Sequence, residues 1–132
     1  MKIKGTLTSG LGEGAYYMSK ELYAHQFKEK LGFKPYPGTL NIIIQDNYIT
    51  SIKECLLQAK KIKGKGKFGD VLYIEAKLNN KINGALIFPV KTHHSPKILE
   101  FIAPVYIRQT LKLKDGDTVT ILADCEKYDQ RS

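Results

Sequence analysis

The sequence contains little cysteine, no tryptophan and almost no arginine. Its 132 residues include 2 Cys, no Trp, and only Arg108 and Arg131 among 21 basic side chains. Cys55 and Cys125 stand 70 positions apart, without a CxxC pair or a ladder of Cys and His residues. This spacing argues against a zinc site and against a disulfide framework. We interpret both cysteines as incidental.

Long apolar runs are also missing. The longest, such as residues 42–44 and 85–90, fall far below the roughly 18 residues that a membrane-spanning helix needs. The first ten residues, MKIKGTLTSG, lack the apolar core of a secretory signal. We therefore expect a soluble, cytoplasmic protein with no membrane partner.

The overall composition is that of a globular protein. Hydrophobic residues make up 42% and charged residues 26% of a chain long enough for one domain, which we place at residues 1–132. The net charge of +8 favours anionic partners such as nucleic acid, phosphorylated metabolites or acidic lipid. Lysine enrichment is also a habit of thermophilic proteins, so charge alone does not choose among these partners.

Alternating apolar residues and turn signals predict a protein dominated by β-structure. One substantial helix is expected at residues 20–31, with Ser19 as N-cap and Gly32 as its stop, and shorter helical turns at 51–57 and 107–111. The Lys-rich run 60–67 reads as a solvated hairpin or mobile loop. A small, closed, mainly antiparallel barrel fits best, because closure removes exposed sheet edges. The expected strands are 2–8, 38–44, 70–78, 81–90, 97–107 and 118–123.

A glycine-rich segment, GLGEGAYY, occupies residues 10–17. Glycines at alternate positions allow backbone amides to turn toward phosphate oxygens. Gly10, Gly12 and Ala15 also match the dinucleotide fingerprint GxGxxA, but the predicted helix starts after the motif and no further βαβ unit follows. The segment is therefore a candidate phosphate cradle, with a simple flexible turn as the alternative.

The segment GTLN places Thr39 and Asn41 two residues apart at the start of a strand. Such residues share one face, while Leu40 points to the core. A hydroxyl and an amide oxygen are hard ligands that suit Mg²⁺ when phosphates and water complete its shell. An ordinary exposed strand start would carry the same residues.

Two further segments carry candidate polar groups. Glu100 lies inside an apolar strand, either on its solvent face or in a pocket as an acceptor or base. Arg108, in so Lys-rich a chain, indicates a specific phosphate or carboxylate contact. In KTHHS, the adjacent His93 and His94 point to opposite faces and cannot easily hold one metal, whereas Thr92 could meet a phosphate or a polar ring edge.

Taken together, GLGEGAYY, PYPGTLN, PVKTHHS, IAPVYIR and LKLKDGD occur in an order that resembles the archaeal CTP-dependent riboflavin kinases. The resemblance covers nearly the whole chain. It implies a six-stranded cradle-loop barrel of the RIFT type, which transfers a phosphoryl group from CTP to the ribityl 5′-hydroxyl of riboflavin and yields FMN and CDP. It also implies Mg²⁺ as the cofactor.

The resemblance assigns roles to individual residues. Mg²⁺ would be bound by Thr39 and Asn41. The flavin would contact Thr92 and Glu100, and Glu100 is also our candidate for the catalytic base. Tyr106 departs from the basic residue expected near its position. We expect the glycine-rich segment and the Thr/Asn pair to meet across a barrel mouth. Nucleotide binding is implied for Gly10, Leu11, Gly12, Glu13, Gly14, Ala15, Val105, Tyr106, Ile107 and Arg108.

Two other functions compete with this one. A basic barrel related to swapped-hairpin transcription regulators could bind nucleic acid through residues 60–67, but no aromatic residues alternate with those lysines as a stacking platform would require. A noncatalytic flavin or nucleotide carrier could use the same pocket. We expect riboflavin and CTP as partners, no nucleic acid, and a monomer or weak homo-oligomer.

Overall fold

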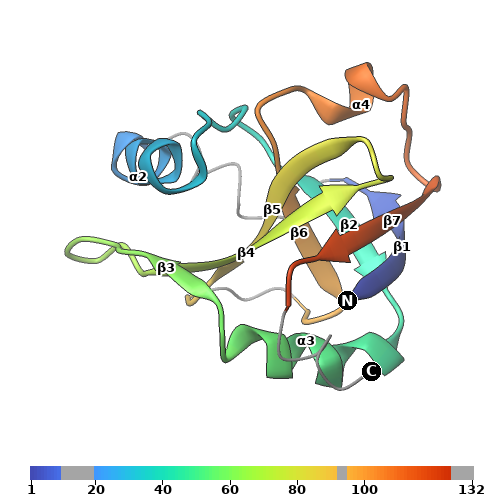
Figure 1. Cartoon of the computed structure of the whole chain (residues 1–132), viewed down its shortest axis with the longest axis horizontal. Helices are drawn as coiled ribbons and strands as arrows, with labels where there is room; N and C mark the ends of the chain where they lie inside the picture. The colour runs from blue at the N-terminus through green and yellow to red at the C-terminus, as the bar shows by residue number, and fades with distance from the viewer. Residues whose placement is uncertain (10–19, 92–94, 126–132) are drawn as a thin grey trace.

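The computed structural model describes residues 1–9, 20–91 and 95–125. Strands dominate these ranges, with a few short helices between them (Figure 1). In chain order the elements are β1 (Lys2–Thr8), α2 (Glu21–Leu31), β2 (Leu40–Ile44), η1 (Asp46–Tyr48), α3 (Ile49–Leu56), β3 (Lys60–Ile62), β4 (Val71–Leu78), β5 (Ile82–Pro89), β6 (Ile98–Ile102), α4 (Ile107–Thr110) and β7 (Thr118–Ala123).

Six strands close into an antiparallel barrel, which confirms the predicted fold class. The strand order is β4-β5-β6-β2-β1-β7, and β7 pairs with β4 to complete the ring. Strand β3 extends the sheet beyond β4. In this ring the seam between β6 and β2 lies opposite the seam between β7 and β4. Closure leaves the six barrel strands with hydrogen-bonded neighbours on both sides.

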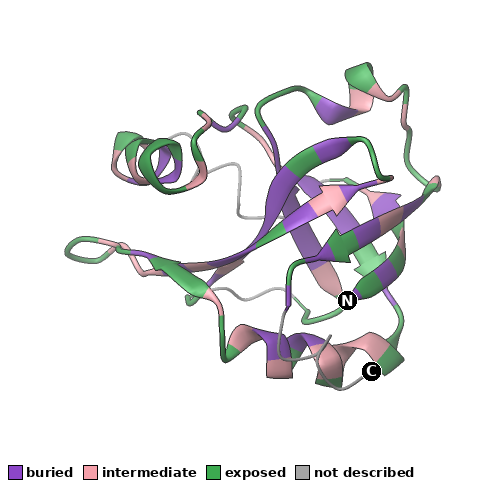
Figure 2. Ribbon diagram, in the orientation of Figure 1, coloured by how far each residue is buried: buried purple, intermediate pink, exposed green. Residues whose placement is uncertain are grey.

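Parts of the barrel wall carry apolar residues on both the inner and the outer face. The buried apolar residues therefore form two clusters (Figure 2). The interior cluster takes Leu40 and Ile42 of β2 together with Phe101 of β6. The second cluster lies between the outer face of β4, β5 and β6 and helix α2, where Tyr23 and Phe27 are fully buried. Because side chains alternate along a strand, residues between those of the interior cluster face outward.

The main helix agrees with the prediction at its C-terminal end. Gly32 adopts a left-handed φ of 80° and its amide N–H bonds the carbonyl of Lys28, as a helix stop requires. The predicted N-cap, Ser19, is wrong: Lys20 holds that position without a side-chain cap, and Ser19 lies outside the described residues. No helix in the described ranges is both long and apolar enough to span a membrane.

Strand β3 corrects the interpretation of the Lys-rich run. Residues 60–62 pair with β4, and only the residues beyond them form the turn. Ile62 is fully buried in the cluster against α2, and the Lys30 ammonium donates to the Lys61 carbonyl at 2.9 Å. A single apolar side chain among lysines was enough to anchor a strand, since it meets a preformed apolar surface.

The two cysteines are not incidental. Cys55 of α3 and Cys125, just after β7, form a disulfide with their Cα atoms 5.8 Å apart. Both residues are buried. Helix α3 packs against the barrel end where β7 finishes, so the fold brings together two residues that the sequence separates by 70 positions.

Candidate functional site

Thr39, Asn41 and Glu100 meet on the outer face of the barrel wall. Asn41 of β2 pairs directly with Glu100 of β6, so their side chains share one face. The Thr39 hydroxyl donates to Glu100 Oε1 at 3.1 Å. Leu40, between them, is buried in the interior cluster, as the alternation predicted. The meeting point is therefore on the outside of the wall at the start of β2. The glycine-rich segment lies outside the described residues, so its expected meeting with the Thr/Asn pair across a barrel mouth stays a prediction.

Burial distinguishes these groups from an ordinary strand surface. Glu100 is 1% exposed and Asn41 is 8% exposed, and they are the buried polar residues of the described chain. Asn41 Oδ1 has no hydrogen-bond partner among the described residues. A buried amide oxygen without a hydrogen-bond partner costs free energy, so the binding of an ion or ligand that supplies the partner is favoured.

The donor set of this cluster fits a hard divalent cation. It offers a hydroxyl oxygen, an amide oxygen and a neighbouring carboxylate, which are the ligand types that Mg²⁺ accepts. The described residues contain no group of three or more His, Cys, Asp or Glu side chains that could form a complete cage. A cation here would therefore need phosphate oxygens and water as its remaining ligands.

The segment 105–108 lies beside this cluster. Tyr106 stacks on Tyr36, with ring centroids 5.0 Å apart and planes 10° from parallel. Between them and the start of β2 is a small hollow of about 60 Å³, which Thr39 and Arg108 both line. Two predicted sets, the metal ligands and the nucleotide segment, thus share one cavity wall.

Arg108 joins segments that are distant in the sequence. Its Nη2 atom donates to Asp115 Oδ1 at 2.7 Å and to the Thr8 carbonyl at 2.9 Å. Ser9 Oγ donates to the other oxygen of the same carboxylate, Asp115 Oδ2, at 2.7 Å. The hydrogen bonds from Ser9 and Arg108 lower the pKa of Asp115 below its ordinary value. The predicted carboxylate contact of Arg108 is present.

An apolar groove of about 350 Å³ adjoins the cluster. Ile87 and Ile98 belong to its lining, and Ile87 pairs with Glu100 across the seam between β5 and β6. Ile98 lies two residues before Glu100 on the same strand face. Val90, at the groove rim, is 60% exposed. Glu100 does not itself line the groove but is the strand partner of Ile87, which does.

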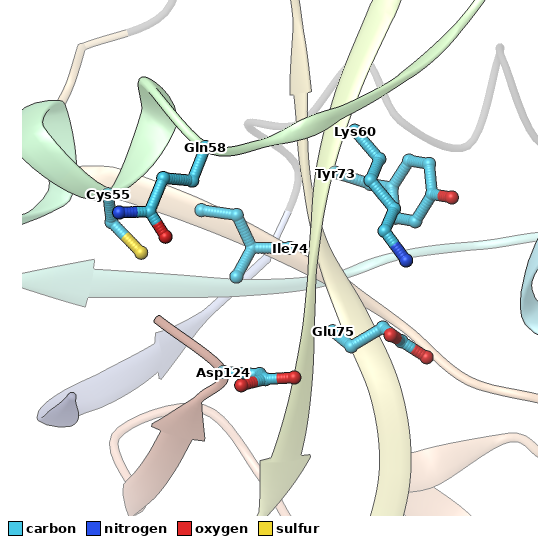
Figure 3. Close-up of a pocket in the computed structure, with 7 residues that line it drawn as sticks. All are labelled: Cys55, Gln58, Lys60, Tyr73, Ile74, Glu75 and Asp124. Carbon is cyan, nitrogen blue, oxygen red and sulfur yellow. The ribbon is translucent and has the colours of Figure 1, made fainter. Parts of the chain in front are cut away.

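A separate hollow of about 220 Å³ lies on the opposite side of the barrel, along the seam between β4 and β7 (Figure 3). It contains none of the predicted site residues. Burial and, to a smaller extent, the charge of Glu75 raise the pKa of Tyr73 there. Its lining is Cys55, Gln58, Lys60, Tyr73, Ile74, Glu75 and Asp124.

Comparison with known proteins gives one consistent result. The family model CTP-dep_RFKase, described as a domain of unknown function, DUF120, matches residues 7–122. A riboflavin kinase from Methanothermobacter thermautotrophicus is 51% identical over 125 residues, which cover 94% of this chain and 100% of the relative. The chain belongs to this riboflavin kinase family.

Other relatives agree. A riboflavin kinase from Methanobrevibacter smithii is 48% identical over 122 residues, covering 92% of this chain and 98% of the relative. A riboflavin kinase from Ignicoccus hospitalis is 45% identical over 128 residues, which cover 92% of this chain and 70% of the relative. Family membership confirms the predicted resemblance and the prediction of an enzyme of the phosphotransferase class.

Within the riboflavin kinase family assignment, the predicted site residues divide into two groups. Residues 10–15 and Thr92 lie outside the described residues, so their predicted roles stay predictions. The others lie at the start of β2, on β6 and in the segment 105–108, whose last two residues begin α4. Sequence reasoning missed Tyr36 and Asp115, although both stand inside quoted motifs, PYPGTLN and LKLKDGD. An exposed Tyr and a turn Asp carry no signal until their partners are known.

Proposed function

We propose that this protein is a CTP-dependent riboflavin kinase, which transfers the γ-phosphoryl group of CTP to the ribityl 5′-hydroxyl of riboflavin with Mg²⁺. The observation that carries the proposal is the cluster of Thr39, Asn41 and Glu100, with its buried, unpartnered amide oxygen. The name of the matching family supports CTP as the donor. The names of the relatives support riboflavin as the acceptor.

Thr39 and Asn41 would hold the cation. When bound, Mg²⁺ supplies positive charge to the transferring phosphates. The pairing of β2 with β6 fixes the backbone of Asn41, and its buried Oδ1 has no partner among the described residues, so the atom is available to a cation. The Thr39 hydroxyl proton points to Glu100, which leaves an oxygen lone pair for a cation.

Glu100 would accept the proton of the 5′-hydroxyl. The hydroxyl oxygen forms a bond to the γ-phosphorus, the bond from that phosphorus to the β–γ bridging oxygen breaks, and CDP leaves with that oxygen. The hydroxyl proton passes to the Glu100 carboxylate and then to solvent. Because phosphoryl transfer depends mainly on in-line positioning and charge neutralisation, the base can be modest.

The apolar groove beside Glu100 would take the flavin ring system. Its lining from α3, β5 and β6 is mostly aliphatic or aromatic, as in sites for flat organic ligands. Thr92 follows Val90 by two residues in the sequence, which supports the flavin contact that the resemblance implies for Thr92. The ribityl chain would then run from the groove toward Glu100.

The donor nucleotide would lie on the other side of the cluster, between residues 10–15 and Val105–Arg108. The hollow shared by Thr39 and Arg108 supports this placement, since phosphates there would be within reach of a cation held by Thr39. Glycine amides and the Arg108 guanidinium would neutralise phosphate charge.

The test is direct. Purified protein is incubated with riboflavin, Mg²⁺ and one nucleoside triphosphate at a time, and FMN is separated chromatographically. We expect FMN with CTP and much less with ATP, GTP or UTP. Tight riboflavin binding without turnover would indicate a carrier. Salt-dependent binding of single-stranded RNA with no flavin affinity would indicate the nucleic-acid-binding alternative.

A further inference from the structure

The Asp115 carboxylate connects Ser9 to Arg108, which the proposed function assigns to the donor nucleotide. One carboxylate oxygen accepts from Ser9, which directly precedes the glycine-rich segment, and the other accepts from Arg108, which ends the segment 105–108. We propose that Asp115 is a positioning residue that holds Ser9 and Arg108 in place for nucleotide binding. This inference rests on the proposed function.

The turn that carries Asp115 is fixed without its side chain. The Gly116 amide donates to the Leu7 carbonyl and the Leu7 amide donates to the Asp117 carbonyl, each at 2.9 Å. Asp117 Oδ2 accepts from the Lys114 amide at 2.9 Å and closes the turn. Backbone bonds therefore place the Asp115 carboxylate beside the end of β1, and its two oxygens are left for Ser9 and Arg108.

The bonds of Arg108 indicate the same role. The two hydrogen bonds of its guanidinium within the described ranges both use Nη2, one to Asp115 and one to the Thr8 carbonyl. A guanidinium has five donors in a rigid plane, so holding one nitrogen orients the others. The Asp115 carboxylate thus fixes the direction in which Arg108 meets a phosphate.

A mainly stabilising role fits this network less well. The Asp115 side chain is 55% exposed, and ion pairs at exposed positions contribute little to stability. Small displacements of phosphate-binding groups, by contrast, have large effects on binding and catalysis. The hydrogen bonds from Ser9 and Arg108 lower the pKa of Asp115, in keeping with a carboxylate that accepts from both partners.

The experiment compares Asp115→Asn with Asp117→Asn, a matched control on the same turn that touches neither Ser9 nor Arg108. Asp115→Asn keeps the size but loses the charge-assisted bonds. We expect its KM for CTP to rise about fivefold or more, with the KM for riboflavin within about twofold of wild type. Ser9→Ala should change the CTP KM in the same direction by less. Asp117→Asn should leave both KM values near wild type.

Several outcomes would overturn the inference: an unchanged CTP KM in Asp115→Asn, equal changes in both KM values, or the same changes in the control. If wild-type protein makes no FMN, the proposed function fails, and CDP affinity by titration calorimetry then decides this inference separately. Weaker CDP binding by Asp115→Asn, with wild-type CDP affinity in Asp117→Asn, would support the inference. Equal CDP binding by both variants, or no CDP binding by wild type, would overturn it.

Discussion

Reduction of the disulfide between Cys55 and Cys125 should strongly lower the stability of this protein. The bond closes a loop of 70 residues between α3 and the end of β7. In its reduced form the unfolded chain regains the entropy of that loop, which the loop-closure relation puts at about 4.4 kcal/mol for this separation. Measured stabilisations are typically about 2–4 kcal/mol, so we expect a loss in the range of about 2 to 4.4 kcal/mol.

The same loss can be expressed as a melting temperature. At about 2.1 cal/mol/K per residue, 132 residues give an unfolding entropy of roughly 0.28 kcal/mol/K. The melting temperature should therefore fall by roughly 7 to 16 °C on reduction. Turnover below the melting range should persist, because Glu100 lies at the seam opposite the one between β7 and β4. Riboflavin affinity should be the more sensitive readout, because α3 carries Cys55 and also lines the groove.

Differential scanning calorimetry with and without a thiol reductant measures the shift, and titration of free thiols in denaturant reports the state of the bond. The Cys55→Ala/Cys125→Ala double variant is the control: its melting temperature should not respond to the reductant. Two free thiols in air-oxidised protein, or a wild-type melting temperature that the reductant leaves unchanged, would refute this reasoning.

Three other predictions concern the site. The Thr39→Ala/Asn41→Ala double variant should lower kcat at least about a hundredfold in the FMN assay, with riboflavin affinity within twofold by fluorescence titration; persistent turnover with normal Mg²⁺ dependence would contradict the metal assignment. Val90→Glu should weaken riboflavin binding about tenfold, because it places a charge at the groove rim. The control Leu122→Glu, at a position 54% exposed on β7, should leave riboflavin binding unchanged. Equal effects of the two variants would show that the groove does not bind the flavin. The pKa of Asp115 is lowered in the folded state, so its contribution to stability is complete above its ordinary value of 3.8 and is lost as pH falls through the lowered value. The difference in melting temperature between wild type and Asp115→Asn should thus shrink only below about pH 4, and a difference that disappears near neutral pH would contradict it.

Several elements could be predicted from local pattern. The strands 2–8 and 118–123 were predicted at the bounds that β1 and β7 have, because alternating residues and flanking turns marked both ends. The segment 97–107 was predicted as a strand that Pro104 interrupts or ends, and β6 indeed stops at Ile102, two residues before that proline. Gly32 marked the helix end through its left-handed backbone, whereas the cap predicted at Ser19 was wrong, because α2 begins after Lys20 without a side-chain cap.

Other features depended on contacts between distant residues. Strand β3 formed because Ile62 found an apolar surface against α2, and the disulfide formed because α3 packs at the end of β7. The short Lys-rich run does not predict the contact of Ile62 with α2, and two isolated cysteines do not predict that they lie side by side. Asp115 was missed for the same reason, since its partners Ser9 and Arg108 come from opposite parts of the chain.

The sequence by itself determined the six barrel strands, the main helix, the candidate residues and, through the order of the motifs, the family. The alternation of side chains also determined that Thr39 and Asn41 share a face. Only the tertiary structure decided that this face is the outside of the wall and that Glu100 lies on it, 61 positions from Thr39. The physical reason is that local pattern fixes which side of a strand a residue occupies, while closure of the barrel fixes which strand becomes its neighbour.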